Sequence, residues 1–164
     1  MSRGFVKEGD QEEPIKIPPR AALPDTEVNY VTPEGKELLL EEKEILERQK
    51  KSLNIEDETE RRRELSLIDG KLGLLMQRLN TAHVIDPKNQ PSGEVRFGAN
   101  VDFKMNGARQ SFKIVGVDEA NVKDHKIAFT SPIAKALTSK SAGERFDFKL
   151  GDEVRPIEIL NVSY

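Results

Sequence analysis

The chain has 164 residues, of which 36% are apolar, 34% charged and 5% aromatic, enough for one modest hydrophobic core with a smaller element beside it. Its 29 acidic and 26 basic residues give a net charge of -3, so no global basic field draws it to nucleic acid or to an anionic membrane. The lack of cysteine excludes disulfides and cysteine-ligated zinc, and two histidines, His83 and His125, are too few for a histidine-rich metal site.

No apolar run reaches the roughly 20 residues of a membrane span, and the N-terminus lacks the apolar core of a signal peptide. We therefore expect a cytoplasmic protein. Residues 1–30, called the arm below, hold four prolines and ten charged side chains without an apolar period, which predicts a disordered or extended segment. The alternative is a peptide, "IKIPPRAAL", that docks on a partner, because Pro18 and Pro19 favour an extended polyproline conformation.

Residues 31–86 are expected to be helical. Thr32 is a cap residue, Pro33 suits the first helical position and Glu34 favours the positive end of the helix dipole. Leucines then repeat every seven residues, at Leu39, Leu46 and Leu53. Leu38 and Ile45 form a second apolar column beside them. A narrow apolar stripe of this kind needs one partner helix.

The second helix is predicted to begin after Asn54, where Asp57 and Glu60 have the spacing of a capping box. Its apolar seam has spacings of three and four: Leu65, Ile68, Leu72, Leu75, Leu79 and Ala82. The charged outer faces favour an antiparallel coiled-coil finger over two helices of an ordinary bundle. The turn former Asn54 favours pairing within the chain over a bare dimerisation coiled coil. Gly70 and Gly73 are interpreted as places where the other helix approaches closely.

Residues 87–94 form a linker rich in proline and glycine, and residues 95–164 alternate short strand patterns with turn signals. Asn106-Gly107 lies between two alternating segments and is the strongest hairpin signal of the sequence. Ser131 and Pro132 open the only helical pattern of this region. The expected fold class is α+β: an N-terminal antiparallel helical hairpin and a C-terminal, mostly antiparallel β-sheet domain with one short helix.

Several strings of this region occur in the order and spacing of the C-terminal domain of Gre-type transcript cleavage factors: "VRFGANV", "FKIVGVDEA" and "SPIAKAL". "LNTAHVID" resembles the end of their coiled coil, so that the resemblance covers residues 32–164. It implies a coiled-coil finger joined to a domain of immunophilin-like fold. It also implies that the sheet domain binds the rim of the secondary channel of bacterial RNA polymerase, while the finger brings tip acids to the active-site magnesium.

The turn that opens the short helix carries the polymerase-binding residues implied by the resemblance: Thr130, Ser131, Pro132 and Ile133. A proline at a helix start gives a preorganised convex surface, and an exposed isoleucine adds apolar area. The simpler interpretation is that Ser131 caps the helix while Ile133, Ala134 and Leu137 face the core.

The finger tip departs from the family pattern. Cleavage-active Gre proteins resemble one another in an Asp-x-x-Glu-Asn motif, and matching its Asn to Asn54 puts Lys50 and Leu53 at the acidic positions. Neither residue can supply the hard oxygen ligands that a second magnesium needs. The tip residues that remain are Glu56, Asp57, Glu58, Glu60, Arg61, Arg62 and Arg63. Among them Asp57 and Glu58 are the candidate metal ligands, although acids also suit a helix start.

The finger is also shorter than in Gre proteins by about one heptad per helix, which moves the tip back by roughly 10 Å. Exposed ion pairs contribute only about 0 to 1 kcal/mol each to stability, too little to account for three consecutive arginines at the tip. Arg61, Arg62 and Arg63 are therefore candidates to contact acidic polymerase residues or the phosphates of backtracked RNA. We expect a non-enzymatic, monomeric regulator that occupies the secondary channel, with RNA polymerase as partner and indirect contact with nascent RNA.

The alternative function within the family is stimulation of transcript cleavage through rearranged tip acids. A prolyl isomerase would need an aromatic-lined pocket, and the phenylalanines fit core positions of strands better. We expect no cofactor held by the chain alone, while the resemblance leaves open a magnesium ion (Mg) shared with the polymerase active site.

Overall fold

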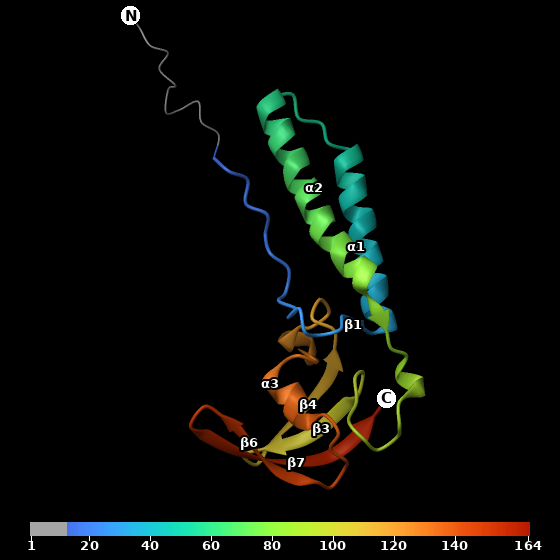
Figure 1. The fold of residues 1–164 in the computed structure, drawn as a ribbon, viewed down its shortest axis with the longest axis vertical. Coiled ribbons are helices and arrows are strands. Elements are labelled where there is room, and N and C mark those ends of the chain that lie inside the picture. Colours follow the sequence, from blue (N-terminus) through green and yellow to red (C-terminus); the bar gives the residue numbers. More distant parts are fainter. Residues whose placement is uncertain (1–12) are drawn as a thin grey trace, which may run out of the picture.

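A computed structural model describes residues 13–164, so the first twelve residues of the predicted arm lie outside the described residues. Figure 1 shows a hairpin of two helices standing on a β-sheet domain, with residues 13–29 of the arm running beside the helices. The predicted α+β class, with a helical hairpin followed by a sheet domain that carries one short helix, is confirmed. Within residues 13–164, no helix is long and apolar enough to cross a membrane.

The hairpin consists of α1 (Pro33–Lys51) and α2 (Glu58–Thr81). Both begin at the predicted caps: the amide of Gly35 donates to Thr32 Oγ1 at 2.9 Å, and the amide of Thr59 donates to Asp57 Oδ1 at 3.1 Å. These side-chain acceptors satisfy backbone donors that have no partner inside the helix. The two caps therefore fix where each helix starts.

The predicted apolar seam forms the core of the finger. The buried residues of this core come from both helices and from the chain two residues before α1: Val31, Leu39, Leu46, Ile68 and Leu75. Leu53, Leu72, Leu79 and Ala82 pack against them. Leu38 and Ile45, the adjoining column, stay 51% and 41% exposed. At about 1.5 Å per residue, α1 and α2 measure roughly 28 Å and 36 Å, so the finger is a long, thin rod.

A two-stranded parallel sheet closes the base of the finger. It pairs β1 (Tyr30–Val31), just before α1, with β2 (His83–Val84), just after α2. The loop after the fourth strand approaches this sheet so closely that a Cβ on Gly116 would lie 2.5 Å from the carbonyl oxygen of Tyr30. Glycine at this position is therefore what lets the finger and the sheet domain meet.

The sheet domain has five strands in the order β5-β4-β3-β7-β6. They are β3 (Asn100–Met105), β4 (Ala108–Val115), β5 (Lys126–Ala128), β6 (Arg145–Leu150) and β7 (Glu153–Ser163). Three of the four pairings are antiparallel, and β4 with β5 is parallel. The parallel pair arises because residues 116–125, with the 3-10 turn η3 (Val122–Asp124), cross back before β5.

Most strand positions follow the sequence pattern. The turn at Asn106 and Gly107 has φ of 53° and 78°, the left-handed values that a two-residue hairpin of this kind requires. One boundary differs: the strand expected from about residue 95 begins only at Asn100. Gly98, with φ of 88°, turns the chain before it. A short 3-10 turn, η2 (Pro87–Asn89), lies in the predicted linker.

The core of the sheet domain lies between the sheet and α3 (Pro132–Leu137). Its buried side chains include Val101, Phe103, Ile114, Leu137, Ile157 and Ile159. The C-terminal residue is tied to the start of the domain, since Tyr164 Oη donates to the carbonyl of Glu94 at 2.6 Å and accepts from the amide of Arg96 at 2.8 Å. Burial raises the pKa of this phenol.

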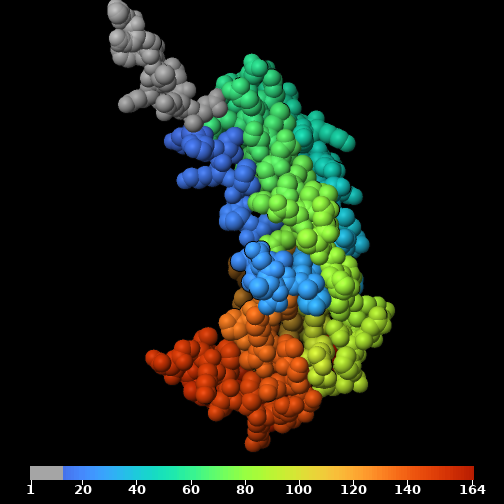
Figure 2. Space-filling view, in the orientation of Figure 1, coloured from blue at the N-terminus to red at the C-terminus, as the bar shows by residue number. Residues whose placement is uncertain are grey.

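Residues 13–29 of the arm form neither helix nor strand and lie against α2 (Figure 2). Arg63 Nη1 donates to the carbonyl of Glu13 at 2.9 Å, Arg78 Nη2 donates to the carbonyl of Ala21, and Asn29 Nδ2 donates to the carbonyl of Arg78 at 3.0 Å. The arm thus follows α2 from its base toward the tip.

The interpretation of the two helical glycines is wrong. A Cβ on Gly70 would lie 2.3 Å from Cδ1 of Ile17, a residue of the arm and not of the other helix, and a Cβ on Gly73 would meet nothing within 4 Å. Gly70 therefore makes room for the arm.

Because Leu75 is fully buried in the finger, Leu75→Ala should lower the free energy of unfolding by about 2–5 kcal/mol. Leu38→Ala makes the same change at a half-exposed position of α1 and should cost less than about 0.5 kcal/mol. Urea unfolding followed by circular dichroism measures both. Equal losses would contradict the assignment of the finger core.

Candidate functional site

The turn before α3 has one capped, buried side and one exposed side. The amide of Ala134 donates to Ser131 Oγ at 3.3 Å, so Ser131 caps the helix. Ala134 and Leu137 are fully buried, Ile133 packs partly buried against the core, and Pro132 is exposed. The interpretation that Ser131 caps the helix while the following apolar residues face the core thus holds for the inner side of this turn. On the outer side Pro132 is exposed, and Thr130, Ser131 and Ile133 are half-exposed around it.

An aromatic hollow lies beside this turn. It has a volume of about 450 Å³ and lies between the base of the finger, α3 and the sheet. The rings of Tyr30, Phe97 and Phe129 line it and contact one another, with centroids 5.5 to 5.7 Å apart. Lys135 Nζ of α3 pairs with Glu27 Oε1 of the arm at 3.0 Å on the same hollow. Sequence reasoning missed this feature because its rings come from distant segments.

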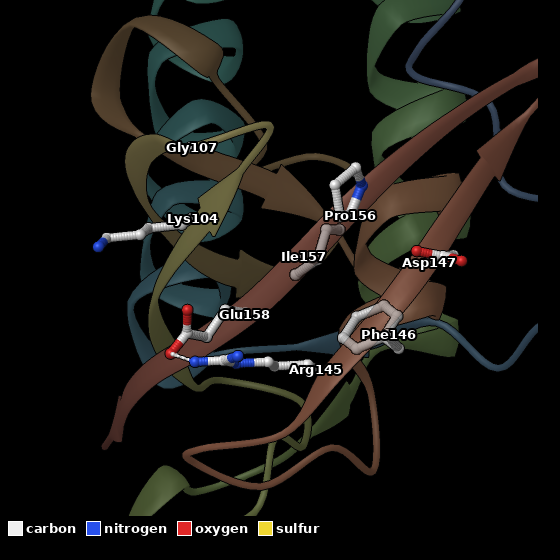
Figure 3. A pocket seen from close by; sticks show the side chains of 8 residues that line it. All are labelled: Lys104, Gly107, Arg145, Phe146, Asp147, Pro156, Ile157 and Glu158. Atoms are coloured by element: carbon white, nitrogen blue, oxygen red, sulfur yellow. Dashed lines mark hydrogen bonds and ion pairs between the residues drawn. The ribbon is translucent and has the colours of Figure 1, made fainter.

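The phenylalanines of residues 95–164 mostly serve packing. Phe103 and Phe148 are buried in the core, and four others pack against it: Phe97, Phe112, Phe129 and Phe146. Figure 3 shows a cavity of about 460 Å³ on the sheet, where Phe146 is the one aromatic ring among charged and aliphatic side chains. Arg145 Nη2 and Glu158 Oε1 pair beside it at 3.4 Å. The lining of this cavity is mainly charged and aliphatic, and the aromatic hollow of the described residues is the one formed by Tyr30, Phe97 and Phe129.

The hairpin gathers the predicted tip residues at the end of the finger, around the loop 52–57. The acids Glu56, Asp57, Glu58 and Glu60 are exposed, as are Arg61 and Arg62, and Arg63 is half-exposed. Arg61 Nη1 donates to the carbonyl of Ile55 at 3.5 Å. Below them Lys50 Nζ pairs with Asp69 Oδ1 at 2.7 Å and joins the two helices.

The tip does not fit a magnesium site held by this chain. One oxygen of Asp57 already accepts the hydrogen bond that starts α2. With Asn54 matched to the Asn of the family motif, Lys50 and Leu53 stand at its acidic positions. Across residues 13–164, no group of three or more His, Asp or Glu side chains is placed to hold a metal ion. Hard cations need several oxygen ligands at once. No chemical step is therefore assigned to Asp57 or Glu58.

An ion-pair cluster joins the arm, the finger and the sheet domain. Arg20 of the arm donates from Nη1 to Glu42 Oε1 of α1 at 2.7 Å and from Nε to Asp118 Oδ1 at 2.9 Å. Arg78 Nε of α2 lies 3.7 Å from Asp118 Oδ2. The hydrogen bond that Arg20 donates to Glu42 is the largest cause that raises the pKa of Arg20; partial burial opposes it, and the bond donated to Asp118 adds to the rise. Sequence reasoning missed this cluster, whose members lie far apart in the chain.

Comparison with known proteins identifies the family. Residues 90–164 match the family described as "Transcription elongation factor, GreA/GreB, C-term". Over 106 residues the chain is 38% identical to transcription elongation factor GreA of Thermodesulfovibrio yellowstonii. The aligned part makes up 63% of this chain and 66% of that protein, so the chain spans slightly less than two thirds of this relative. It is 35% identical over 115 residues to GreA of Acidiphilium cryptum, covering 69% of this chain and 73% of that protein. The chain belongs to the GreA/GreB family.

Among solved structures, the GreA/GreB elongation factor of Nitrosomonas europaea is similar at 20% identity, with 85% of this chain and 100% of that chain covered and a TM-score of 0.40. The GreA/GreB match confirms the resemblance that the motifs of residues 95–164 indicated.

Asp57→Ala should lower the free energy of unfolding of the finger by about 0.5–2 kcal/mol, because it removes the side chain that caps α2. Glu56→Ala, one position earlier and outside the helix, is the control and should have a much smaller effect. Chemical unfolding followed by helical circular dichroism separates the two. A harmless Asp57→Ala would show that the carboxylate does not act as the cap.

Proposed function

We propose that this GreA/GreB-family chain binds bacterial RNA polymerase in the cytoplasm, as a monomer, and regulates transcription by placing its finger in the secondary channel. The sheet domain stays outside as an anchor. The observation that carries the proposal is a thin, well-packed finger whose tip has Lys50 and Leu53 where the family motif has two acids. In this proposal the chain is not an enzyme and brings no metal ion of its own.

The dimensions of the finger support insertion into a narrow pore. Two helices side by side, each about 10–12 Å wide, make a rod that is far narrower than a globular domain. Its core of buried leucines keeps the two helices together, and the pair of Lys50 with Asp69 ties them near the tip. A rod of this kind can occupy a channel and hinder the passage of nucleotides or of RNA.

The chemistry of the tip favours occupancy over cleavage. Hydrolysis of a phosphodiester by two metals requires carboxylates within a few ångströms of the reacting phosphate. The remaining acids Glu56, Glu58 and Glu60 are exposed on different sides of a helix start. Arg61, Arg62 and Arg63 add positive charge next to them, which suits contact with acidic polymerase residues or RNA phosphates.

The turn before α3 is the proposed contact with the polymerase rim. Pro132 holds a fixed backbone angle, so its surface is preorganised and binding loses little conformational entropy. The hollow of Tyr30, Phe97 and Phe129 next to this turn offers apolar area to the same partner.

Purified protein added to backtracked elongation complexes should leave the RNA 3′ end unchanged while slowing nucleotide addition. Gel analysis of end-labelled and uniformly labelled nascent RNA measures both effects. Shortened RNA that depends on Glu56, Glu58 or Glu60, tested by alanine substitution, would instead establish the alternative, stimulation of cleavage through rearranged tip acids.

Pro132→Asp should weaken association with RNA polymerase at least tenfold, because it puts a charge in the middle of the proposed contact. Aspartate is tolerated at a helix start, so the fold should persist. Val154→Asp is the matched control: it also places a carboxylate at an exposed apolar position, 51% exposed, but on β7. Fluorescence anisotropy with labelled protein measures affinity. Equal affinities for the two folded variants would refute the rim contact.

A further inference from the structure

The arm fits a second apolar column on α2. Ile15 and Ile17 are half-buried and Lys16 between them is exposed, the alternation of an extended segment with one side against a surface. On α2, Leu67, Gly70 and Leu74 share a face that the apolar seam does not use. Ile17 fills the space over Gly70, and Leu74 lines the same hollow as Ile17 and Pro19.

Arg20 is the point where the arm touches both parts of the molecule. Its guanidinium makes two hydrogen bonds to Glu42 of α1, at 2.7 Å and 3.0 Å, and one to Asp118 of the sheet domain. The side chains of Arg20 and Asp118 are only 18% and 8% exposed. An arginine that donates two parallel hydrogen bonds to one carboxylate fixes the relative orientation of the two side chains and also binds them strongly. A single side chain thus links arm, finger and sheet domain.

The cluster is balanced only while Arg20 is in place. Arg20 and Arg78 face Glu42 and Asp118, two positive against two negative charges. Without Arg20, Asp118 keeps Arg78 at 3.7 Å as its remaining partner in the cluster, and Oδ2 of Asp118 accepts no hydrogen bond. A poorly paired, nearly buried carboxylate is costly, so loss of Arg20 favours movement of the loop that carries Asp118.

Packing of the arm against the finger is incomplete around residues 17–21. Hollows of about 490 Å³ and 380 Å³ remain between residues 17–21 of the arm and the finger. Residues 13–29 belong to no strand, so no ladder of backbone hydrogen bonds fastens them. Segments with few packed contacts and exposed backbone groups open at low free-energy cost.

The finger also stands on a narrow base. Below the helices, the hydrogen bond from Thr32 Oγ1 to Glu119 Oε2, at 2.5 Å, and the close approach of Gly116 to Tyr30 join it to the sheet domain, whereas β1 and β2 tie only its own two ends together. A long rod on a small base changes its angle easily unless a second contact, away from that base, braces it. Glu42 lies more than two helical turns above Thr32 and provides such a point.

We propose that the arm is a clasp with two states. In the closed state Arg20 fixes the angle between the finger and the sheet domain. In the open state the arm leaves α2 and the finger moves over a wider range of angles. A partner or ligand that captures the arm therefore releases the finger. This inference concerns the free protein and does not rest on the proposed function.

Distances between spin labels test the clasp directly. The chain has no cysteine, so Ser66→Cys on α2, Lys149→Cys on β6 and Lys16→Cys on the arm, all exposed positions, provide specific labelling sites. The pair 66/149 reports the finger angle and the pair 16/66 reports the arm. Both should give one narrow distance in the parent protein. Arg20→Ala should replace both narrow peaks by broad distributions, whereas an unchanged 66/149 distance would overturn the proposal.

Gly70→Ala and Gly73→Ala form a matched pair that opens the clasp without touching its charges. Both add a methyl group to α2 and raise helix propensity alike, but only the methyl group at residue 70 collides with Ile17. Gly70→Ala should broaden both distances, and Gly73→Ala should leave both narrow. If Gly70→Ala frees the arm while the 66/149 distance stays narrow, the arm does not set the angle and the clasp is refuted. A narrow 16/66 distance in Gly70→Ala would refute the seating of the arm. Circular dichroism verifies that each variant is folded.

Discussion

The position of the finger depends on a buried hydrogen bond between Thr32 and Glu119. Thr32 is fully buried and has two roles: its hydroxyl accepts from the amide of Gly35, which starts α1, and donates to the carboxylate of Glu119 in the loop after β4. Gly35 must lack a side chain here, since a Cβ would lie 2.9 Å from Glu119 Oε2. Lys126 Nζ, 3.6 Å from Glu119 Oε1, offsets the buried charge. The residue that begins the rod is thus the residue that attaches it.

Local signals in the sequence predicted the elements well because each depends on neighbouring residues. The caps at Thr32, Asp57 and Ser131 and the turn at Asn106 lie where the pattern indicated. The junction was beyond such reasoning, because Thr32 and Glu119 are 87 positions apart and Arg20 and Asp118 are 98 apart. The docking peptide considered for "IKIPPRAAL" was assigned to a partner, whereas residues 15–21 lie on the finger of the same chain. Pro18 and Pro19 were the only sequence signal for docking, and no apolar period in the arm pointed to the surface of α2.

The candidate site was predictable in its place but not in its chemistry. Heptad spacing put residues 56–63 at the end of a hairpin, and the motifs of residues 95–164 pointed to the family that the comparisons show. An acid at a helix start can cap, complement the dipole or bind a metal, and sequence spacing is the same for all three. The geometry distinguishes them for Asp57, whose carboxylate accepts from the amide of Thr59. The aromatic hollow beside α3 had no sequence signal, since Tyr30 precedes the finger and Phe129 follows most of the sheet.

A shared fold leaves the function of the tip open, because the residues that perform chemistry are few and separable from those that hold the rod together. The leucines of the seam and the caps keep the finger folded whatever stands at positions 50 and 53. Here Lys50 pairs with Asp69 and Leu53 packs against the finger core, so both positions strengthen the hairpin and supply no metal ligand. A hairpin end held together in this way suits the channel occupancy proposed above, whereas delivery of a metal ion needs carboxylates that are free to coordinate.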